Sequence, residues 1–322
     1  MKKAAIPILL NPSAGAGRAG RLRRRLEEEL HRQGVSFELF VTESEGHLRA
    51  LTRELGVPLG LIAGAGGDST FLIMADEIIR AGVPTALAMI GLGSSNDIPA
   101  AFGLNTVAVA CRTLLDGRPR RIDAGRIADG ETLRGYFIGQ ANIGLGAVVN
   151  RYVAALAERR PRLAARQTLA GFFGIRNALR QRKVPVHLSI KSEAGLIEGS
   201  FTAAIFANTR YWATGKAIAP EATPDDGRLD ACLIGPCSMK RLARIYAAAK
   251  TGRHVLEPEV RTARAKEFAV RIEVPLDIQS DGEIIDFHGA RGALRIVTIG
   301  AVPSALTIMV PAADDGQKAG RS

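Results

Sequence analysis

Cysteine is scarce in this chain. Its 322 residues include three cysteines, Cys111, Cys232 and Cys237. An odd number at such wide spacing supports neither a disulfide framework nor a cysteine-based zinc site. Proteins of reducing compartments typically lack disulfides, so we expect a cytoplasmic protein.

Long apolar runs are missing as well. No stretch approaches the roughly 18 to 20 apolar residues that a transmembrane helix requires. The N-terminus, MKKAAIPILLNPSAG, combines basic residues with an apolar run, but that run ends at Pro12 and is too short for a secretory signal peptide. We interpret residues 4–10 as the first strand of the folded chain.

Aromatic residues make up only 5% of the chain, whereas the formal net charge is +11. Such a surplus favours polyanionic partners, namely nucleic acid, anionic lipid or nucleotide. No nucleic-acid-binding motif is visible, and few aromatics are available to stack on bases. We therefore expect no nucleic-acid partner and assign the charge to a nucleotide or an anionic lipid surface.

The first 120 residues alternate between apolar strands and amphipathic helices. Strands are predicted at 4–10, 35–42, 58–63 and 84–90, and helices at 21–34, 45–55, 70–81 and 105–117. Strands that alternate with helices predict a parallel sheet covered on both faces.

After about residue 120 the pattern changes to short strands bounded by turn residues, which predicts a mostly antiparallel β domain. Two helical stretches, 147–182 and 238–251, interrupt it. We place an α/β domain at 1–120, a β domain at 121–311 and a disordered tail at 312–322. The final strand of the β domain is allowed to pack back on the first domain.

The stretch GAGGDST, residues 64–70, follows a predicted strand and precedes a predicted helix. A glycine turn there would present backbone N–H groups and the positive end of the helix to an anion such as phosphate. Asp68 would supply a carboxylate to Mg²⁺ bound to that anion. The alternative is a tight corner without a ligand.

Two further loops follow strands at the same predicted edge of the sheet. In 91–104, hydroxyl and N–H donors are joined by a second carboxylate, Asp97, although Ser and Asn there also fit a capped short helix. In 11–20, Arg18 and Arg21 carry guanidinium groups suited to phosphate, although the loop also reads as a flexible, solvated segment.

Two aspartate-rich turns occur in the β domain. SDGEI, at 280–284, has the Asp-Gly pair of a β-hairpin. PDDGRLD, at 224–230, is also turn-like, but Asp225, Asp226 and Asp230 are oxygen donors suited to a divalent cation.

Residues 151–183 form a basic amphipathic stretch, with nine basic side chains and interspersed Phe and Leu. Such a segment either lies on an anionic bilayer or packs on its own domain with a solvated basic face. The sequence leaves both interpretations open.

In this order, the pieces resemble the diacylglycerol kinase catalytic-domain family, in its short bacterial form. The resemblance reaches about residue 311 and rests on the motifs Asn11-Pro12-Ser13-Ala14-Gly15, Gly66-Gly67-Asp68-Ser69-Thr70, Gly93-Ser94-Ser95-Asn96-Asp97, ANIGLGA (141–147), the 207–230 segment and SDGE (280–283). It implies a Rossmann-like α/β domain, similar to NAD kinases, that binds ATP, a cleft, and an antiparallel β-sandwich domain on the acceptor side.

The resemblance also implies roles for individual residues. Asp281 and Glu283 match the region of the proton acceptor, without a choice between them. Asp226, with the backbone of Thr223 and Arg228, matches a structural Mg²⁺ site. Asp68 stays a separate candidate, for Mg²⁺ bound to the phosphate. The ATP-binding positions are Asn11, Thr42, Gly66, Gly67, Asp68, Ser69, Thr70, Gly93, Ser94, Ser95, Asn96 and Asp97.

The sequence departs from the family pattern at two places. Ser69 replaces a glycine, which would strain the backbone if φ were positive there. Leu72 and Ile73 replace an Asn-Glu pair, which would remove two polar contacts near the nucleotide.

These features favour an ATP- and Mg²⁺-dependent lipid kinase that acts on a long-chain lipid alcohol, either diacylglycerol or a ceramide or sphingoid type. It is expected at the inner face of the membrane as a peripheral protein, with a homodimer left open. The alternatives are a NAD kinase-like enzyme with a soluble acceptor and a catalytically weak lipid-binding regulator.

Overall fold

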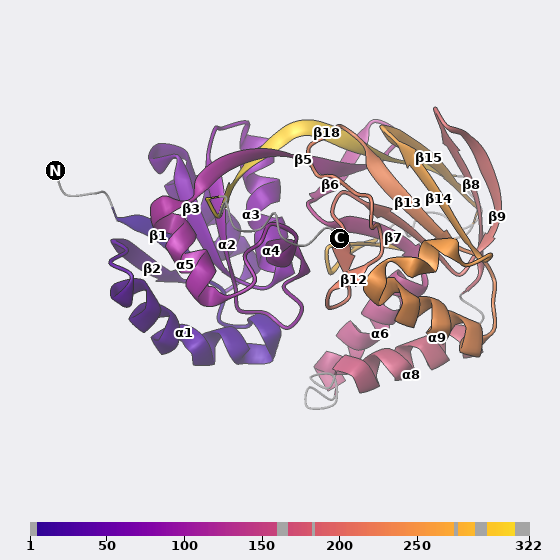
Figure 1. The fold of residues 1–322 in the computed structure, drawn as a ribbon, viewed down its shortest axis with the longest axis horizontal. Helices are drawn as coiled ribbons and strands as arrows, with labels where there is room; N and C mark the ends of the chain where they lie inside the picture. Colours follow the sequence, from indigo (N-terminus) through magenta and orange to yellow (C-terminus); the bar gives the residue numbers. More distant parts are fainter. Residues whose placement is uncertain (1–4, 160–166, 182–183, 274–275, 287–294, 313–322) are drawn as a thin grey trace, which may run out of the picture. The chain divides into compact units, whose positions relative to one another are not determined.

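The computed structural model describes residues 5–159, 167–181, 184–273, 276–286 and 295–312 (Figure 1). These residues form two compact units. Unit 1 comprises Met1–Ile122 together with Ala305–Ser322, and unit 2 comprises Asp123–Ser304. Nearly all of the predicted tail, 312–322, lies outside the described residues.

Unit 1 alternates strands and helices from its start. Its elements are β1 (Ile6–Leu10), α1 (Ala14–Arg32), β2 (Phe37–Val41), α2 (Glu45–Leu59), β3 (Leu61–Gly66), α3 (Asp68–Ala81), β4 (Ala86–Gly91), α4 (Asp97–Ala101) and α5 (Val107–Asp116). The strand order is β2-β1-β3-β4 and all neighbours are parallel. The strands β1, β3 and β4 are almost wholly buried, as expected for parallel strands with both faces covered.

The predicted alternation is therefore confirmed, with two differences at helix ends. The helix predicted at 45–55 continues to Leu59 and stops at Gly60, where φ is 65°. A left-handed residue is a common helix terminator, and here it overrides the strand predicted to begin at residue 58. Within α1, the three residues 15–17 are left-handed, so regular helix begins only after them.

Unit 2 is built mainly of antiparallel strands. It contains most of β5 (Arg118–Asp129), then β6 (Thr132–Phe137), β7 (Gln140–Gly144), β8 (Val186–Ser192), β9 (Gly195–Phe201), β10 (Ala203–Ala207), β11 (Tyr211–Trp212), β12 (Lys216–Ala217), β13 (Leu229–Ile234), β14 (Val260–Ala265), β15 (Glu267–Ile272), β16 (Asp277–Ser280) and β17 (Glu283–Asp286). One sheet has the order β14-β13-β10-β7-β16-β17. In the second sheet, β15 pairs with β8, and β8 pairs with β9.

The last strand, β18 (Arg295–Val310), serves both units. Its first residues pair antiparallel with β15 in unit 2, and Thr307 and Ile308 pair parallel with β4 in unit 1. Unit 1 therefore takes its outer strand from the end of the chain.

Unit 2 also contains helices α6 (Leu145–Arg159), α8 (Gln167–Arg180) and α9 (Met239–Ala248), and the short helices η1 (Ala249–Thr251) and η2 (Arg253–Leu256). The predicted helix at 147–182 thus divides into α6 and α8, with residues 160–166 outside the described part. No helix among the described residues is long and apolar enough to cross a membrane.

A buried histidine lies in the core of unit 2. His254 has no exposed surface, and its Nε2 lies 3.0 Å from the carbonyl oxygen of Ile218 and 3.6 Å from Cys232 Sγ. Its Nδ1 is buried without a partner among the described residues. Burial lowers the pKa of His254 and raises that of the Cys232 thiol to about 12, so both groups are neutral core members near pH 7.

This histidine should make stability depend on pH. The unfolded chain binds a proton at His254 near its ordinary pKa of about 6.5, whereas the folded chain does so only at lower pH. The contribution of neutral His254 to the free energy of unfolding is therefore complete above about pH 6.5 and is lost as pH falls. We expect the melting temperature to drop between pH 7 and 5, and to drop less in His254→Gln. Identical pH profiles for the two proteins would contradict this assignment.

Candidate active site

Three loops meet at the carboxyl edge of the parallel sheet in unit 1. They follow β1, β3 and β4 and contain Gly15, Gly67 and Gly93. A Cβ atom added to Gly93 would lie 2.6 Å from the Cα of Gly67, and one added to Gly15 would lie 3.4 Å from the Cα of Gly93. The loops therefore approach one another through backbone at the edge where α/β sheets bind ligands, and at Gly93 there is no room for a side chain.

Hydrogen bonds fasten the three loops to one another. Asn11 Nδ2 donates to Thr70 Oγ1 at 3.0 Å, which ties the first loop to α3. Arg18 Nη1 donates to the carbonyl oxygen of Gly93 at 3.3 Å, which ties the first loop to the third. The backbone N–H of Gly93 donates to the carbonyl oxygen of Gly66 at 3.0 Å. Residues predicted from separate motifs are thus brought together.

Asp68 holds the third loop in place. Its carboxylate accepts hydrogen bonds from the backbone N–H groups of Asp97 at 3.2 Å and Ile98 at 3.0 Å. Both partners are about 30 residues away in sequence, so the carboxylate acts as a brace between α3 and α4. Its predicted contact with Mg²⁺ stays a prediction.

The third loop is also ordered from within. Asn96 has a left-handed backbone with φ of 55°, and its side chain bonds both to the N–H and to the carbonyl oxygen of Gly93. Ser95 Oγ donates to Asp97 at 2.6 Å, while Ser94 is exposed. The exposed hydroxyl of Ser94 thus remains accessible to a ligand.

The first turn of α3 completes this edge. Gly67 precedes it with φ of −102°, and Asp68 is its first residue. An α-helix leaves its first N–H groups without acceptors inside the helix, and its dipole favours an anion there. Ser69 lies in this helical turn and not at positive φ, so the strain considered from the sequence does not arise.

Three other predicted features face the protein interior. Thr42 is 4% exposed, and its hydroxyl donates to the carbonyl oxygen of Leu10 at 3.2 Å. Leu72 and Ile73 are 6% and 7% exposed, and they belong to the apolar core. The departure from the Asn-Glu pair therefore supplies core packing on α3.

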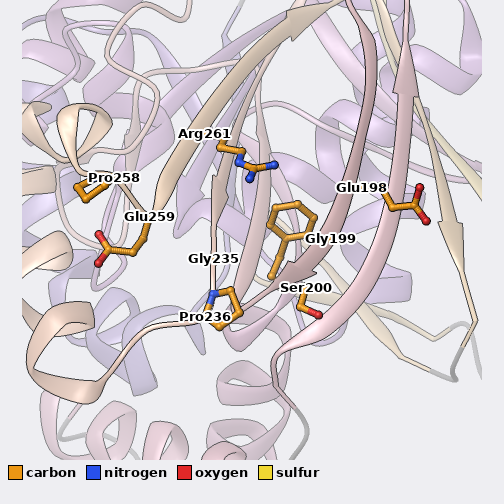
Figure 2. Close-up of a pocket in the computed structure, with 9 residues that line it drawn as sticks. Glu198, Gly199, Ser200, Gly235, Pro236, Pro258, Glu259 and Arg261 are labelled. Atoms are coloured by element: carbon orange, nitrogen blue, oxygen red, sulfur yellow. The ribbon is translucent and has the colours of Figure 1, made fainter.

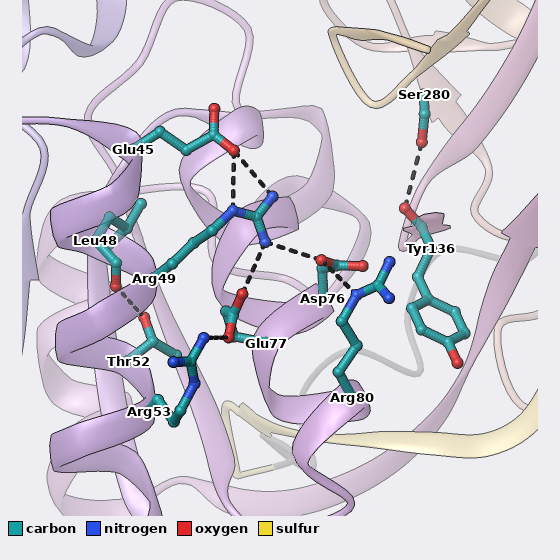
Figure 3. A network of polar contacts seen from close by, with 10 residues as sticks. All are labelled: Glu45, Leu48, Arg49, Thr52, Arg53, Asp76, Glu77, Arg80, Tyr136 and Ser280. Atoms are coloured by element: carbon teal, nitrogen blue, oxygen red, sulfur yellow. Dashed lines mark hydrogen bonds and ion pairs between the residues drawn. The ribbon is translucent and has the colours of Figure 1, made fainter. Parts of the chain in front are cut away.

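Sequence reasoning missed an ion-pair network that joins α2 to α3 (Figure 3). Asp76 and Glu77 are buried on α3, and Arg49 Nη1 on α2 donates to them at 2.8 and 3.0 Å. Arg53 adds a 2.8 Å bond to Glu77, and Arg80 adds a 3.0 Å bond to Asp76. The signal available in the sequence was the acidic pair Asp76-Glu77 between the apolar runs 71–75 and 78–79.

Glu77 keeps its charge in this network despite burial. Burial raises the pKa of Glu77, but hydrogen bonds from Arg53 and Arg49 outweigh it, so the pKa lies below its usual range. The paired charges anchor α3, whose N-terminus forms the floor of the loop cluster.

In unit 2, SDGE forms the hairpin turn between β16 and β17, as predicted. Asp281 and Gly282 have φ of 44° and 101°. The Asp281 carboxylate is 7% exposed and accepts the backbone N–H groups of Ile138, Gly139 and Gln140 at 2.6 to 3.1 Å. Asp281 therefore fixes the turn to the segment that leads into β7.

Glu283, by contrast, is exposed at the start of β17. The helix α6 supports the turn beside it, because Asn150 Nδ2 donates to the carbonyl oxygen of Gly282 at 2.5 Å and Arg151 pairs with Asp277. Of the two predicted carboxylates, Glu283 is the one that a substrate can reach directly.

At the predicted structural Mg²⁺ site, the side chains of Asp226 and Thr223 are bonded to other protein groups. Asp226 accepts the N–H of Arg228 at 2.9 Å and pairs with the guanidinium of Arg264. Thr223 donates from its hydroxyl to the carbonyl oxygen of Glu221 at 3.3 Å. A divalent cation at Asp226 would have to replace a guanidinium, so these residues as arranged do not fit the ion.

Asp230 lies near Asp226 and Arg264 and is also affected by them. Burial raises the pKa of Asp230 to about 6, against the effect of Arg264 and with added repulsion from Asp226. Among the described residues, no group of three or more His, Cys, Asp or Glu is placed to hold a metal ion.

A cavity of about 330 Å³ opens elsewhere in unit 2 (Figure 2). It lies beside β9 and the start of β14 and is lined partly by Glu198, Glu259 and Arg261. None of the residues predicted from sequence lines it. Two carboxylates in its wall are unfavourable for a phosphate group.

Comparison with known families covers both units. Residues 5–127 match the family model described as "Diacylglycerol kinase catalytic domain". Residues 139–310 match the one described as "YegS C-terminal NAD kinase beta sandwich-like domain". The resemblance and the fold class expected from the sequence are thereby confirmed.

Individual relatives match along nearly the whole chain. A protein named "Diacylglycerol kinase" from Mycobacterium tuberculosis is 29% identical over 312 residues, which is 95% of each chain. One named "Probable lipid kinase YegS-like" from Pseudomonas aeruginosa is 27% identical over 82% of this chain and 85% of its own. A crystal structure of a diacylglycerol kinase from Bacillus anthracis has a TM-score of 0.67 at 15% identity, covering 96% of this chain and 98% of that one.

Proposed function

Because the chain belongs to the diacylglycerol kinase family, with both the catalytic domain and the YegS-type C-terminal domain, we propose that it is a lipid kinase that transfers the γ-phosphate of MgATP to the hydroxyl of a long-chain lipid alcohol. The observation that supports this most is the convergence of three glycine loops around the N-terminus of α3. Relatives named as lipid kinases favour this function over a NAD kinase-like one.

The reaction assigns separate tasks to the two units. The N-terminal N–H groups of α3 and the Arg18 guanidinium bind the phosphates, and Mg²⁺ arrives with ATP as part of the substrate. Glu283 accepts the proton of the lipid hydroxyl as its oxygen attacks the γ-phosphorus. The bond from phosphorus to the β,γ-bridging oxygen breaks, and ADP leaves with that oxygen.

The acceptor follows from family membership only as a class. Diacylglycerol is the first candidate, because a relative over nearly the whole chain is named "Diacylglycerol kinase". Ceramide or a sphingoid base is the second, and the expected site of action is an anionic membrane surface at the cytoplasmic face.

The test is transfer of labelled γ-phosphate to detergent-dispersed diacylglycerol, ceramide, sphingosine or phosphatidylglycerol, with NAD and no acceptor as references. We expect one lipid to be labelled. Label in NAD alone would favour the NAD kinase-like alternative, and lipid binding without any turnover would favour the regulator.

Glu283→Gln should lower kcat about 100-fold on that lipid and leave ATP affinity and melting temperature unchanged, since the variant removes only a proton acceptor. Glu198→Gln, another exposed glutamate of unit 2, serves as the matched control and should keep full activity. Full activity in Glu283→Gln would reject Glu283 as the proton acceptor.

A further inference from the structure

The outer face of α9 is exposed, although the helix is amphipathic. Its inner side packs Ile245 and Leu242 into a buried cluster of unit 2, together with Ala249 just after its end. At 100° per residue the opposite arc is centred near Ala247. All residues on that arc are exposed, namely Met239, Lys240, Ala243, Arg244, Tyr246 and Ala247. We call this arc the α9 face.

The α9 face carries basic side chains that are not paired with acidic ones among the described residues. From Ser238 to Leu256 the sequence contains five Lys or Arg and no Asp or Glu. The two acids that follow, Glu257 and Glu259, both pair with Arg241, at 2.6 and 2.8 Å. Within the described residues, Lys240 and Arg244 have no carboxylate at ion-pair distance, so their charges face solvent.

Apolar and aromatic surface accompanies these charges. Met239 is 43% exposed and Tyr246 is 46% exposed, one behind the other on the helix. Lys216 Nζ lies 4.9 Å from the centre of the Tyr246 ring, which adds a third cation next to the face. Exposed Met and Tyr beside Lys and Arg are suited to the boundary between head groups and acyl chains.

We propose that the α9 face is the surface by which this protein docks on an anionic lipid bilayer. The proposal rests on the lipid-kinase function, because a substrate that stays in the bilayer requires the enzyme to reach it. Charge complementarity favours anionic lipid, and the partly exposed Met239 and Tyr246 add contacts that a purely electrostatic partner does not use. The surface differs from 151–183, the segment that the sequence suggested for this role.

The structure limits what 151–183 contributes. Of this segment, Arg151 pairs with Asp277, and Asn150 just before it supports the hairpin turn at Gly282. On α8, Phe173 and Arg176 are exposed. Residues 160–166 and 182–183 lie outside the described part, so the membrane contact predicted for the segment stays a prediction.

The test is co-sedimentation with vesicles, without nucleotide. Lys240→Gln/Arg244→Gln should bind vesicles of phosphatidylglycerol and phosphatidylcholine about 25-fold more weakly than the unaltered protein, or about fivefold for each charge removed. Lys191→Gln/Arg271→Gln removes the same charge from β8 and β15 and should bind as the unaltered protein does. None of the three proteins should bind vesicles made of phosphatidylcholine alone.

Three outcomes would overturn the proposal: no binding of the unaltered protein to anionic vesicles, equal loss in both double variants, or binding to duplex DNA in preference to vesicles. Phosphorylation of detergent-dispersed lipid should be equal in all three proteins, since micelles deliver the substrate without a bilayer. Vesicle binding that depends on the α9 face, without phosphorylation of any lipid, would reject the proposed function and leave the docking surface in place.

Discussion

Gly93→Ala is expected to lower kcat/KM for ATP by about 100-fold or more. The new Cβ would lie 2.6 Å from the Cα of Gly67, whereas ordinary contact begins at 3.4 Å. Backbone cannot give way as a flexible side chain can, so the loops after β3 and β4 must move apart by nearly 1 Å. Displacements of this size in a phosphoryl-transfer site typically cost about two orders of magnitude.

Gly67→Ala is the matched control. Its Cβ would meet the Cα of Gly93 at 3.5 Å, an ordinary contact, and its φ of −102° suits any residue. Steady-state kinetics and ATP binding by calorimetry should separate the two variants, with a small effect in Gly67→Ala. Wild-type ATP affinity and turnover in Gly93→Ala would show that the loop cluster does not bind the nucleotide.

Asp281→Asn should destabilise unit 2 by about 3 kcal/mol. The carboxylate now accepts three backbone N–H groups, from Ile138, Gly139 and Gln140. An amide has one acceptor oxygen, and its NH₂ group would face N–H donors in a nearly buried site. We expect a lower melting temperature together with lost activity, because the turn that presents Glu283 would no longer be fixed.

Glu283→Gln on the same turn separates the two roles, since it should lose turnover without losing stability. Melting temperature and kcat, measured for both variants, show which carboxylate accepts the proton and which one braces the turn. If Asp281→Asn melted like the unaltered protein and lost only kcat, Asp281 would be the proton acceptor and the bracing role assigned to it would be wrong.

The sequence was sufficient for features that depend on neighbours along the chain. The alternation of strands and helices, the strand-to-helix junction within 64–70 and the hairpin at 280–284 all follow from local patterns, and the structure has all three. The junction is tighter than predicted, because β3 continues to Gly66 and α3 begins at Asp68, which leaves Gly67 alone between them. The meeting of three loops followed from the rule that parallel strands end at one edge.

Long-range partners could not be predicted. Asp281 bonds to groups more than 140 residues away, and Asp68 to groups about 30 residues away, so their bracing roles leave no local signal. The same holds for Arg264, which pairs with Asp226 where the family resemblance implied a cation. For Ser69 the sequence left φ open, and the helical turn that contains it settles the question.

The double use of β18 has a consequence for how the chain is divided and made. A fragment that ends at Ile122 would contain every helix that the structure describes in unit 1, yet it would leave the edge of β4 open, because Thr307 and Ile308 follow unit 2 in the chain. An uncovered parallel edge invites pairing with other chains. Unit 1 therefore completes its sheet only after the whole of unit 2 has left the ribosome, and a nascent chain must protect that edge in the meantime.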